Sequence, residues 1–352
     1  MNPFERVMLV LEGRGLQADR IPCMNPTLTV TVGFMEAAGV RWPEAHRNPE
    51  VMARLAEKGS KLAGFDSVNI PFDYVVEAEV FGAQVDFMEE PAGRGVALWP
   101  TVRKPIIGKH SRVRLPENVE EAGRIPVVSK AVRLLKQRFE GVKPVTVVMN
   151  APFTCVGFYL MEASEFMGML REAPEEAEGM VADYAEAFAR IAQAYEEAGA
   201  DIITLHDMGA SCAVTPPQAF KTIAAPALKA IVKGLRCKTI LSICGPNLAI
   251  VKAMVEVGAS AVAFDEKTPI REARKPVDEV KPGYPVAGNL SPKLLAKGRP
   301  EEVSSMVRRV IAEGVDVVAP GCDLHLQTPT GNLKVMVETV ERYGGRRYPF
   351  HG

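Results

Sequence analysis

The fold is decided by residues 201–243, whose sequence is DIITLHDMGASCAVTPPQAFKTIAAPALKAIVKGLRCKTILSI. Residues 201–205 and 238–243 are rich in Ile, Leu and Thr, which predicts two buried strands. Between them, residues 217–233 are amphipathic and are followed by Gly234, which predicts a helix and its end. This order predicts two parallel strands joined by a right-handed crossover.

The same alternation of strands and helices extends along most of the chain. We expect seven strands, at residues 67–70, 145–149, 201–205, 238–243, 261–264, 285–288 and 315–319. Seven or eight strand and helix units favour an α/β fold closed into a (β/α)8 TIM barrel over an open doubly wound sheet. No Gly-x-Gly-x-x-Gly follows any expected strand, which argues against a dinucleotide-binding fold.

The domain organisation is expected to be simple. The 352 residues would form one barrel domain. Residues 1–62 are predicted to be an N-terminal helical extension packed on the barrel, with helices at 2–11 and 48–62. Residues 85–140 are rich in Pro and Gly in their first part and are predicted to be an irregular insertion over one face.

Composition excludes several classes of protein. The 42 Lys and Arg residues balance 43 Asp and Glu residues, so the basic excess typical of a general nucleic-acid binder is missing. No apolar run reaches the length of a membrane span, and residues 1–6 do not have the pattern of a signal peptide. We therefore expect a cytoplasmic protein with no membrane and no nucleic-acid partner, and with its six scattered cysteines reduced.

Polar, acidic and thiol side chains follow the ends of the expected strands. The carboxyl ends of barrel strands meet at one mouth, where the active sites of this fold lie. The candidates collected in this way are Asn69, His206, Asp207, Cys244, Asp265, Glu266, Asn289, Cys322 and His325. Cys244 and Cys322 each adjoin a glycine, which allows a sharp turn of the backbone. Two thiols at one mouth suit a zinc ion.

Four segments carry a resemblance to a known family. They are 241–245 (LSICG), 264–267 (FDEK), 288–292 (GNLSP) and 319–322 (APGC). Together they resemble the zinc-dependent methylcobamide:coenzyme M methyltransferases, which belong to the uroporphyrinogen decarboxylase superfamily. Residues 19–22, 41–46, 64–67 and 77–79 resemble the same family, so the likeness spans nearly the whole chain.

The resemblance implies a ligand set and a mechanism. In that family a His-x-Cys motif and a distant Cys hold zinc, which implies Cys244 and Cys322 as ligands; the histidine position falls on Ser242. His206, Glu266 or His325 would then complete the site, and we take His206 as the third metal ligand. Zinc would activate the acceptor thiol, which attacks the methyl group of a methylcobamide presented at the barrel mouth by a small corrinoid protein.

The remaining roles are also expectations. Cys244, Cys322 and Glu266 are the expected catalytic residues. The expected substrate-binding residues are Asn69, Asp207, Asp265 and Asn289. The insertion at 85–140 would form part of the surface that receives the corrinoid protein.

Three alternatives to methyl transfer onto a thiol stay open. Tetrahydrofolate could be the methyl acceptor, or the enzyme could act on the donor side and methylate the corrinoid protein. A relative without activity that kept the fold is the third. Porphyrinogen decarboxylation is disfavoured, because residues 22–27 (PCMNPT) lack the arginines of the motif that binds substrate carboxylates in the decarboxylases.

Overall fold

The computed structural model describes residues 1–111 and 115–345, and its centre is a curled sheet of seven parallel strands. The strands lie in the order β1-β4-β5-β6-β7-β8-β9. Their bounds are Val68–Ile70, Val145–Asn150, Ile202–His206, Lys238–Ile243, Ala261–Phe264, Val286–Leu290 and Val317–Pro320. These are the seven strands expected from the sequence, and neighbours along the chain are neighbours in the sheet. The α/β barrel fold is confirmed.

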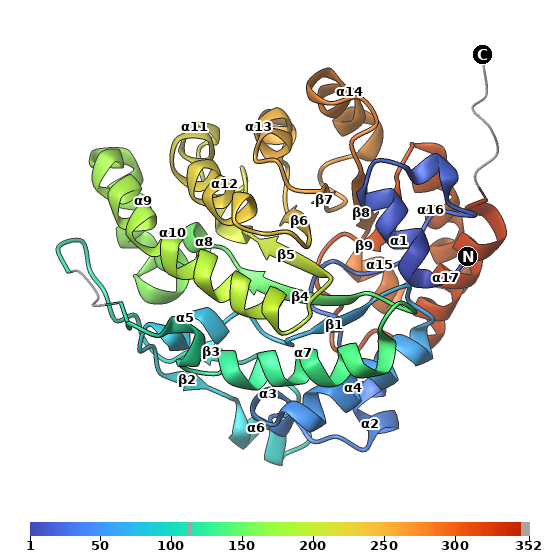
Figure 1. Ribbon diagram of the computed structural model, residues 1–352, viewed down its shortest axis with the longest axis horizontal. Coiled ribbons are helices and arrows are strands. Elements are labelled where there is room, and N and C mark those ends of the chain that lie inside the picture. The colour runs from blue at the N-terminus through green and yellow to red at the C-terminus, as the bar shows by residue number, and fades with distance from the viewer. Residues whose placement is uncertain (112–114, 346–352) are drawn as a thin grey trace.

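The crossover helices cover the outside of the sheet (Figure 1). The longer ones are α7 (Ile125–Phe139), α9 (Ala163–Glu172), α10 (Pro174–Glu197), α12 (Ala225–Lys233), α14 (Ile270–Val280), α16 (Pro300–Ala312) and α17 (Thr330–Tyr343). Shorter pieces are α8 (Pro152–Thr154), η3 (Cys155–Leu160), η4 (Met208–Ala210), α11 (Pro217–Ala219), η5 (Phe220–Ala224), η6 (Leu248–Ile250), α13 (Val251–Glu256) and α15 (Pro292–Lys297). The ring of helices closes because α17 packs against α4 (Pro49–Ala63), which in turn packs against α7.

An extended segment closes the sheet between β9 and β1. The amide of Val318 donates to the carbonyl of Pro22 (3.0 Å), and the amide of Met24 donates to the carbonyl of Val318 (3.1 Å). On the other side, the amide of Asp66 donates to the carbonyl of Cys23 (2.8 Å). The eighth position of the barrel is therefore taken by residues 22–24, which pair only briefly with β9.

The N-terminal region is less uniformly helical than expected. It contains α1 (Pro3–Leu11), η1 (Gly15–Gln17), α2 (Val32–Ala38), α3 (Glu44–Arg47) and α4, separated by non-helical stretches. Val7, Val10 and Leu11 of α1 cluster with the buried strand residues Ile202 and Ile240. Because those two residues lie near the amino ends of β5 and β6, α1 covers the end of the barrel opposite the expected mouth.

The expected irregular insertion at 85–140 is shorter than predicted. Residues 112–114 lie outside the described residues. The first part holds α6 (Glu89–Gly93), η2 (Val119–Glu121) and a two-stranded pair of β2 (Val85–Asp86) with β3 (Thr101–Val102). Its last part is the regular helix α7, whose buried Ile125, Val128 and Val132 face the barrel. The helix forms because its apolar residues recur at helical spacing. Pro126 does not interrupt it, since this proline lies in the first turn of the helix.

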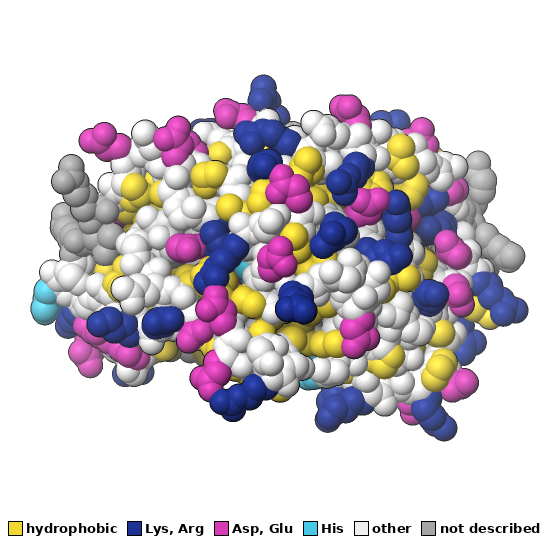
Figure 2. All heavy atoms as spheres, turned by 90° about the horizontal axis from the view of Figure 1, so that it is seen from below, with side chains coloured by type: hydrophobic (Ala, Val, Ile, Leu, Met, Phe, Trp, Pro, Cys, Tyr) yellow, Lys and Arg dark blue, Asp and Glu magenta, His cyan; other side chains and the backbone are white. Residues whose placement is uncertain are grey.

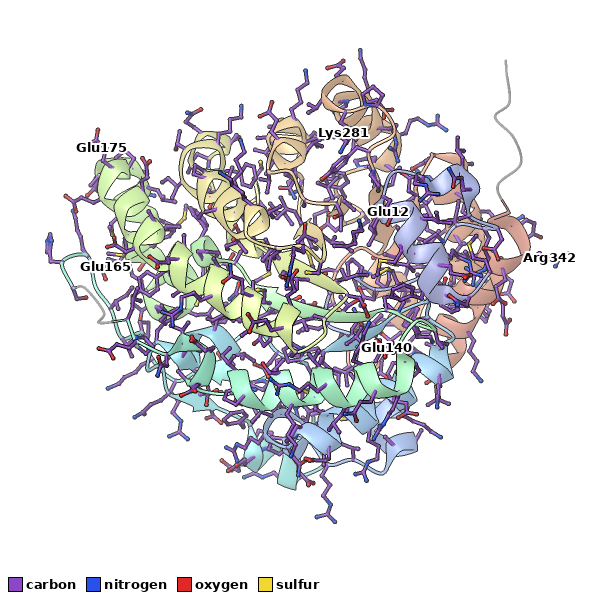
Figure 3. The ribbon with its side chains drawn as sticks, in the orientation of Figure 1. Glu12, Glu140, Glu165, Glu175, Lys281 and Arg342 are labelled. Carbon is purple, nitrogen blue, oxygen red and sulfur yellow. A yellow bond between two sulfur atoms is a disulfide. The ribbon has the colours of Figure 1, made fainter. Side chains whose placement is uncertain are left out.

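Charged side chains lie on the outside of the molecule. Glu175 and Arg342 lie at the edge of the molecule and point away from its body (Figure 3). Over one face, Lys and Arg side chains are interspersed with Asp and Glu side chains (Figure 2). Among the described residues, no helix is both long enough and apolar enough to cross a membrane.

Candidate metal centre

Three potential metal ligands meet at the carboxyl ends of the strands. His206 is the last residue of β5, Cys244 directly follows β6, and Cys322 lies two residues beyond β9. One ligand atom from each lies within 4.8 Å of the others. The structure thus brings together the three residues predicted as metal ligands, although 116 residues separate the first from the last along the chain.

The two cysteines of this centre are in contact. The structure joins the Sγ atoms of Cys244 and Cys322 in a disulfide, with Cα atoms 6.3 Å apart. This differs from the expectation of six reduced cysteines; Cys23, Cys155, Cys212 and Cys237 are free. A disulfide and a dithiolate metal site are alternative states of the same two sulfurs, since metal ligation requires the reduced, deprotonated thiols.

His206 has the state that a metal ligand needs. Its side chain is buried, and burial lowers its pKa, which favours the neutral imidazole. Its Nδ1 lies 3.3 Å from Ser242 Oγ, and its Nε2 is buried without a hydrogen-bond partner among the described residues. When Nδ1 carries the proton it donates to Ser242 Oγ, and the lone pair of Nε2 is left free for a metal ion.

His206 and Ser242 are direct neighbours across two strands. They are paired in the register of β5 and β6. Ser242 occupies the position of the histidine in the His-x-Cys motif, two residues before Cys244. The imidazole therefore comes from the adjacent strand, at the same level of the barrel. Two thiols and one imidazole with an unpartnered nitrogen fit the donor set that zinc prefers.

Tyr74 and Asp323 support this centre. The ring of Tyr74 stacks on His206 with centroids 4.6 Å apart and an interplanar angle of 12°. The Tyr74 hydroxyl donates to Asp323 Oδ1 (2.6 Å), and Asp323 follows Cys322 directly in the chain. Tyr74 was missed in the sequence because nothing in the order of residues joins it to Asp323, 249 positions away. Its only signal is its place shortly after β1.

Asp265 and Asn289, predicted to bind substrate, are engaged in holding the loops of the mouth. Asp265 accepts from the amides of Gly245 (2.7 Å) and Lys267 (2.9 Å). The side-chain amide of Asn289 donates to the carbonyls of Asp265 (3.1 Å) and Thr268 (3.0 Å). These bonds fix the loop after β6, which carries Cys244, against the loop after β7.

Asp207 and Asn69 are likewise bonded within the protein. Asp207 is buried, and its Oδ1 accepts from the amide (3.1 Å) and the hydroxyl (2.5 Å) of Thr154. Burial raises the pKa of Asp207 to about 6, and its Oδ2 has no partner. Asn69 Oδ1 accepts from Ser67, and its amide donates to the carbonyl of Asn25.

Glu266 and His325 are exposed and do not join the three ligands. Glu266 Oε1 accepts from the hydroxyl of Ser291 (3.0 Å). His325 accepts from the amide of Gln327 (3.2 Å). Of the three side chains considered as the missing ligand, His206 is the one that the structure places beside the cysteines.

Close backbone packing explains the two glycines beside the cysteines. Gly245 has φ +109°, a conformation that residues with side chains rarely adopt. A Cβ atom on Gly321 would lie 2.7 Å from the Cα atom of Asp265, inside any normal contact distance. Both positions therefore require glycine for the loops that carry Cys244 and Cys322 to reach the same site.

The comparison with protein families agrees with this geometry. The family described as uroporphyrinogen decarboxylase (URO-D) matches residues 2–343. The chain belongs to the uroporphyrinogen decarboxylase family. A methylcobamide:CoM methyltransferase (MtbA) of Methanosarcina mazei is 32% identical to this member, over 97% of the chain and 98% of the relative. A uroporphyrinogen decarboxylase of Thermus thermophilus is 24% identical, over 90% of the chain and 95% of the relative.

A solved structure supports the same assignment. A methyltransferase from Methanosarcina mazei superposes with a TM-score of 0.89 at 26% identity, covering 97% of this chain and 99% of that one. Full-length likeness to methyltransferases, at higher identity than to the decarboxylase, confirms the resemblance found in the sequence. It also confirms the expectation that this family member is a methyltransferase.

Proposed function

We propose that this enzyme transfers the methyl group of a methylcobamide, carried by a separate small corrinoid protein, to a thiol acceptor. A zinc ion held by Cys244, Cys322 and His206 would assist the transfer. The observation that carries the proposal is the meeting of these three side chains, from three strand ends, within 4.8 Å. The activity for which the relatives are named, methylcobamide:CoM methyltransferase, supplies the methyl donor and the thiol class.

Each ligand has a defined part in this proposal. The reduced thiols of Cys244 and Cys322 would supply two negative charges, and His206 would bind through its unpartnered Nε2. Zinc held by these residues would supply Lewis-acid chemistry that lowers the pKa of an acceptor thiol. The acceptor sulfur then bonds to the methyl carbon while the carbon–cobalt bond breaks, and both electrons of that bond stay on cobalt.

Other mouth residues are proposed to act on the substrates. Glu266 is exposed at the rim beside Ser291 and could receive the proton of the acceptor thiol. Asn69, Asp207, Asp265 and Asn289 are proposed to shape the substrate site through the loops that they hold. Residues 85–111 and 115–124 are proposed to contribute to the surface that receives the corrinoid protein. The required reduced thiols imply a reducing compartment such as the cytoplasm.

Demethylation of free methylcobalamin tests the proposal. The reduced, zinc-loaded enzyme is mixed with methylcobalamin and either 2-mercaptoethanol, coenzyme M or tetrahydrofolate, and the absorbance of the cobalamin is followed. We expect turnover with a thiol, and a loss of at least about 100-fold in Cys244→Ser, Cys322→Ser and His206→Ala. Cys212→Ser is the matched control, because Cys212 is a free cysteine outside the ligand set.

The other outcomes separate the alternatives. Turnover with tetrahydrofolate alone would show that the acceptor is a folate and not a thiol, with methylcobamide still the methyl donor. A further outcome is that the enzyme methylates reduced cobalamin from a small methyl donor and fails to demethylate methylcobalamin with any acceptor. That result would show that it methylates the corrinoid protein. Activity that survives all three ligand substitutions would contradict a role for the metal centre.

A further inference from the structure

A carboxylate beside the candidate metal centre has no counter-charge among the residues that the structure describes. Asp323 is half-buried, and its Oδ1 accepts from the hydroxyl of Tyr74 (2.6 Å) and the amide of Leu28 (3.0 Å). Within residues 1–111 and 115–345, its Oδ2 has no hydrogen-bond partner and no Lys or Arg forms an ion pair with it. Two neutral donors thus hold the side chain in place and leave its negative charge uncompensated.

Two more deeply buried aspartates of this chain are paired with arginines, whereas Asp323, like Asp207 and Asp265, is held by neutral donors. Asp66 pairs with Arg6 (2.8 Å) and Arg20 (2.9 Å), and Asp73 pairs with Arg124 (2.9 Å). Carboxylates removed from water are normally paired in this way, because desolvation of an unpaired charge is costly. A half-buried Asp323 without a cation is therefore poised to receive one from a ligand.

Aromatic rings form a wall next to this carboxylate. Tyr74, Trp99 and Tyr159 pack in one cluster with Leu28 and Val148. Burial is the main reason that the pKa of Tyr74 and of Tyr159 is raised, and the Asp323 carboxylate adds to the effect at both. The Tyr74 hydroxyl is itself bonded to Asp323, so the carboxylate adjoins this cluster. Aromatic faces attract cations, and a carboxylate beside aromatic rings is the combination that binds an ammonium group.

We propose that Asp323 and the aromatic wall of Tyr74, Trp99 and Tyr159 bind the ammonium group of the methyl acceptor. The acceptor would then be a small aminothiol, whose sulfur reaches Cys244, Cys322 and His206. A short spacer between nitrogen and sulfur is required, because Asp323 follows Cys322 directly and consecutive Cα atoms lie about 3.8 Å apart. An acceptor with an anionic tail would be repelled by the same carboxylate. This inference rests on the proposed methyl transfer to a thiol.

A first experiment compares three thiols with the same two-carbon spacer. They are 2-aminoethanethiol, 2-mercaptoethanol and 2-mercaptoethanesulfonate, each assayed with methylcobalamin and the zinc-loaded enzyme, with rates corrected for the thiolate fraction of the free thiol. We expect kcat/KM for the aminothiol to exceed that of the neutral thiol by at least about 10-fold and that of the sulfonate by more. Asp323→Asn should bring the ratio of aminothiol to neutral thiol close to one, whereas Asp278→Asn, at a half-buried aspartate on α14, should leave the ratio unchanged.

A second experiment does not need turnover. Trp42→Phe leaves Trp99 as the single tryptophan, so its fluorescence reports on the aromatic wall. Titration with 2-(methylthio)ethylamine, the product of the aminothiol reaction, should change this fluorescence with saturation. Adding Asp323→Asn to the Trp42→Phe variant should weaken binding at least about 10-fold. The uncharged analogue 2-(methylthio)ethanol should bind weakly to both proteins.

The two experiments separate the two proposals. If no thiol demethylates methylcobalamin but the ammonium ligand binds and requires Asp323, the thiol acceptor is wrong and the ammonium site stands. If thiols are methylated fastest when they carry the sulfonate, and Asp323→Asn changes neither the ranking nor the fluorescence titration, the ammonium site is overturned and the methyl transfer stands.

Discussion

At the metal centre, a hydroxyl group stands opposite the imidazole that we assign as a ligand. Ser242 Oγ lies 3.3 Å from His206 Nδ1, on the side of the ring away from the unpartnered Nε2. When Nδ1 carries the proton, it donates to this hydroxyl, and the lone pair of Nε2 can bind a metal ion. In the proposed zinc site, Ser242 would therefore orient the ligand His206 instead of binding the metal itself.

Ser242→Ala tests this role. We expect zinc affinity to fall by about 10-fold, because the imidazole loses the hydrogen-bond partner that orients its ring. The affinity is measured by competition with a chromophoric chelator under reducing conditions. Thr204→Val, which removes a buried and unpartnered hydroxyl from β5, is the control and should leave the affinity unchanged. Equal affinities for Ser242→Ala and the unsubstituted enzyme would show that Ser242 does not orient the ligand.

Glu77 predicts a second effect, on stability. Its side chain is buried, and burial raises its pKa to about 8, so the folded protein keeps a proton that the unfolded chain loses above pH 4.5. Stability contributed by this group therefore falls as the pH rises from about 5 to 8. Relative to Glu77→Gln, the free energy of unfolding of the unsubstituted protein should decrease by about 2–4 kcal/mol over that interval.

Urea denaturation of both proteins at pH 5 and pH 8 provides the measurement. Glu140→Gln, at a side chain that is exposed at the end of α7, is the matched control and should show no such dependence. A difference between Glu77→Gln and the unsubstituted protein that stays constant with pH would show that Glu77 is not protonated in the folded state.

Among the elements, residues 22–24 are the least regular part of the barrel wall. The side chain of Asp66 holds this segment in place, because its Oδ2 accepts from the amide of Cys23 (2.7 Å). The same carboxylate also accepts hydrogen bonds from Arg6 and Arg20. One buried carboxylate thus joins α1, the closing segment and the residue before β1. The closure of the barrel depends on it more than on strand pairing.

Asp66→Asn should destabilise the protein strongly. Removing the charge takes one of two acidic partners from the buried Arg6, which keeps its pair with Asp19, and takes the buried partner from Arg20; breaking a buried pair costs about 3–5 kcal/mol. The free energy of unfolding from urea denaturation, read by circular dichroism, measures the effect. Glu12→Gln removes an exposed ion pair with Arg14 and should have no measurable effect. Similar stabilities for the two variants would refute this role of Asp66.

The elements show what could be predicted from the sequence. The seven strands were found because runs of Val, Ile and Thr between amphipathic helices are typical of buried parallel strands. The helix α14 was not expected, since Pro276 lies inside it. Residues 22–24 (PCM) have neither the length nor the composition of a strand, so the eighth position was missed.

The arrangement of the candidate metal centre could be predicted from the sequence only in part. Placing residues at strand ends suffices to bring His206, Cys244 and Cys322 to one mouth. The hydrogen bond between Tyr74 and Asp323, and the bonds that occupy Asp265 and Asn289, depend on side-chain directions in loops. The periodicity that identifies strands and helices carries no information on loop conformation, so these contacts could not be predicted from the sequence.

For the whole molecule, metal binding should couple to unfolding. A ligand set drawn from β5, β6 and the end of β9 exists only when the sheet is curled, so the unfolded chain offers no equivalent site. Zinc at about 100 times its dissociation constant should therefore stabilise the reduced protein by about 2.7 kcal/mol.

Thermal unfolding with zinc and with a chelator measures this coupling. We expect Tm to rise by a few degrees with zinc in the reduced protein and to be unchanged by zinc in His206→Ala and Cys244→Ser. Oxidised protein, in which Cys244 and Cys322 are joined, should also fail to respond. A zinc-dependent shift of equal size in all of these proteins would indicate binding elsewhere.

The closing segment has a consequence for shortening the chain. A fragment that starts after residue 31 would retain all three ligand residues and all seven strands of the sheet. It would lack the segment beside Val318, and with it the backbone partner of the strand that leads to Cys322. Such a truncated protein would have the full set of ligands in its sequence and no barrel to bring them together. Engineering of this enzyme should therefore leave its first thirty-one residues intact.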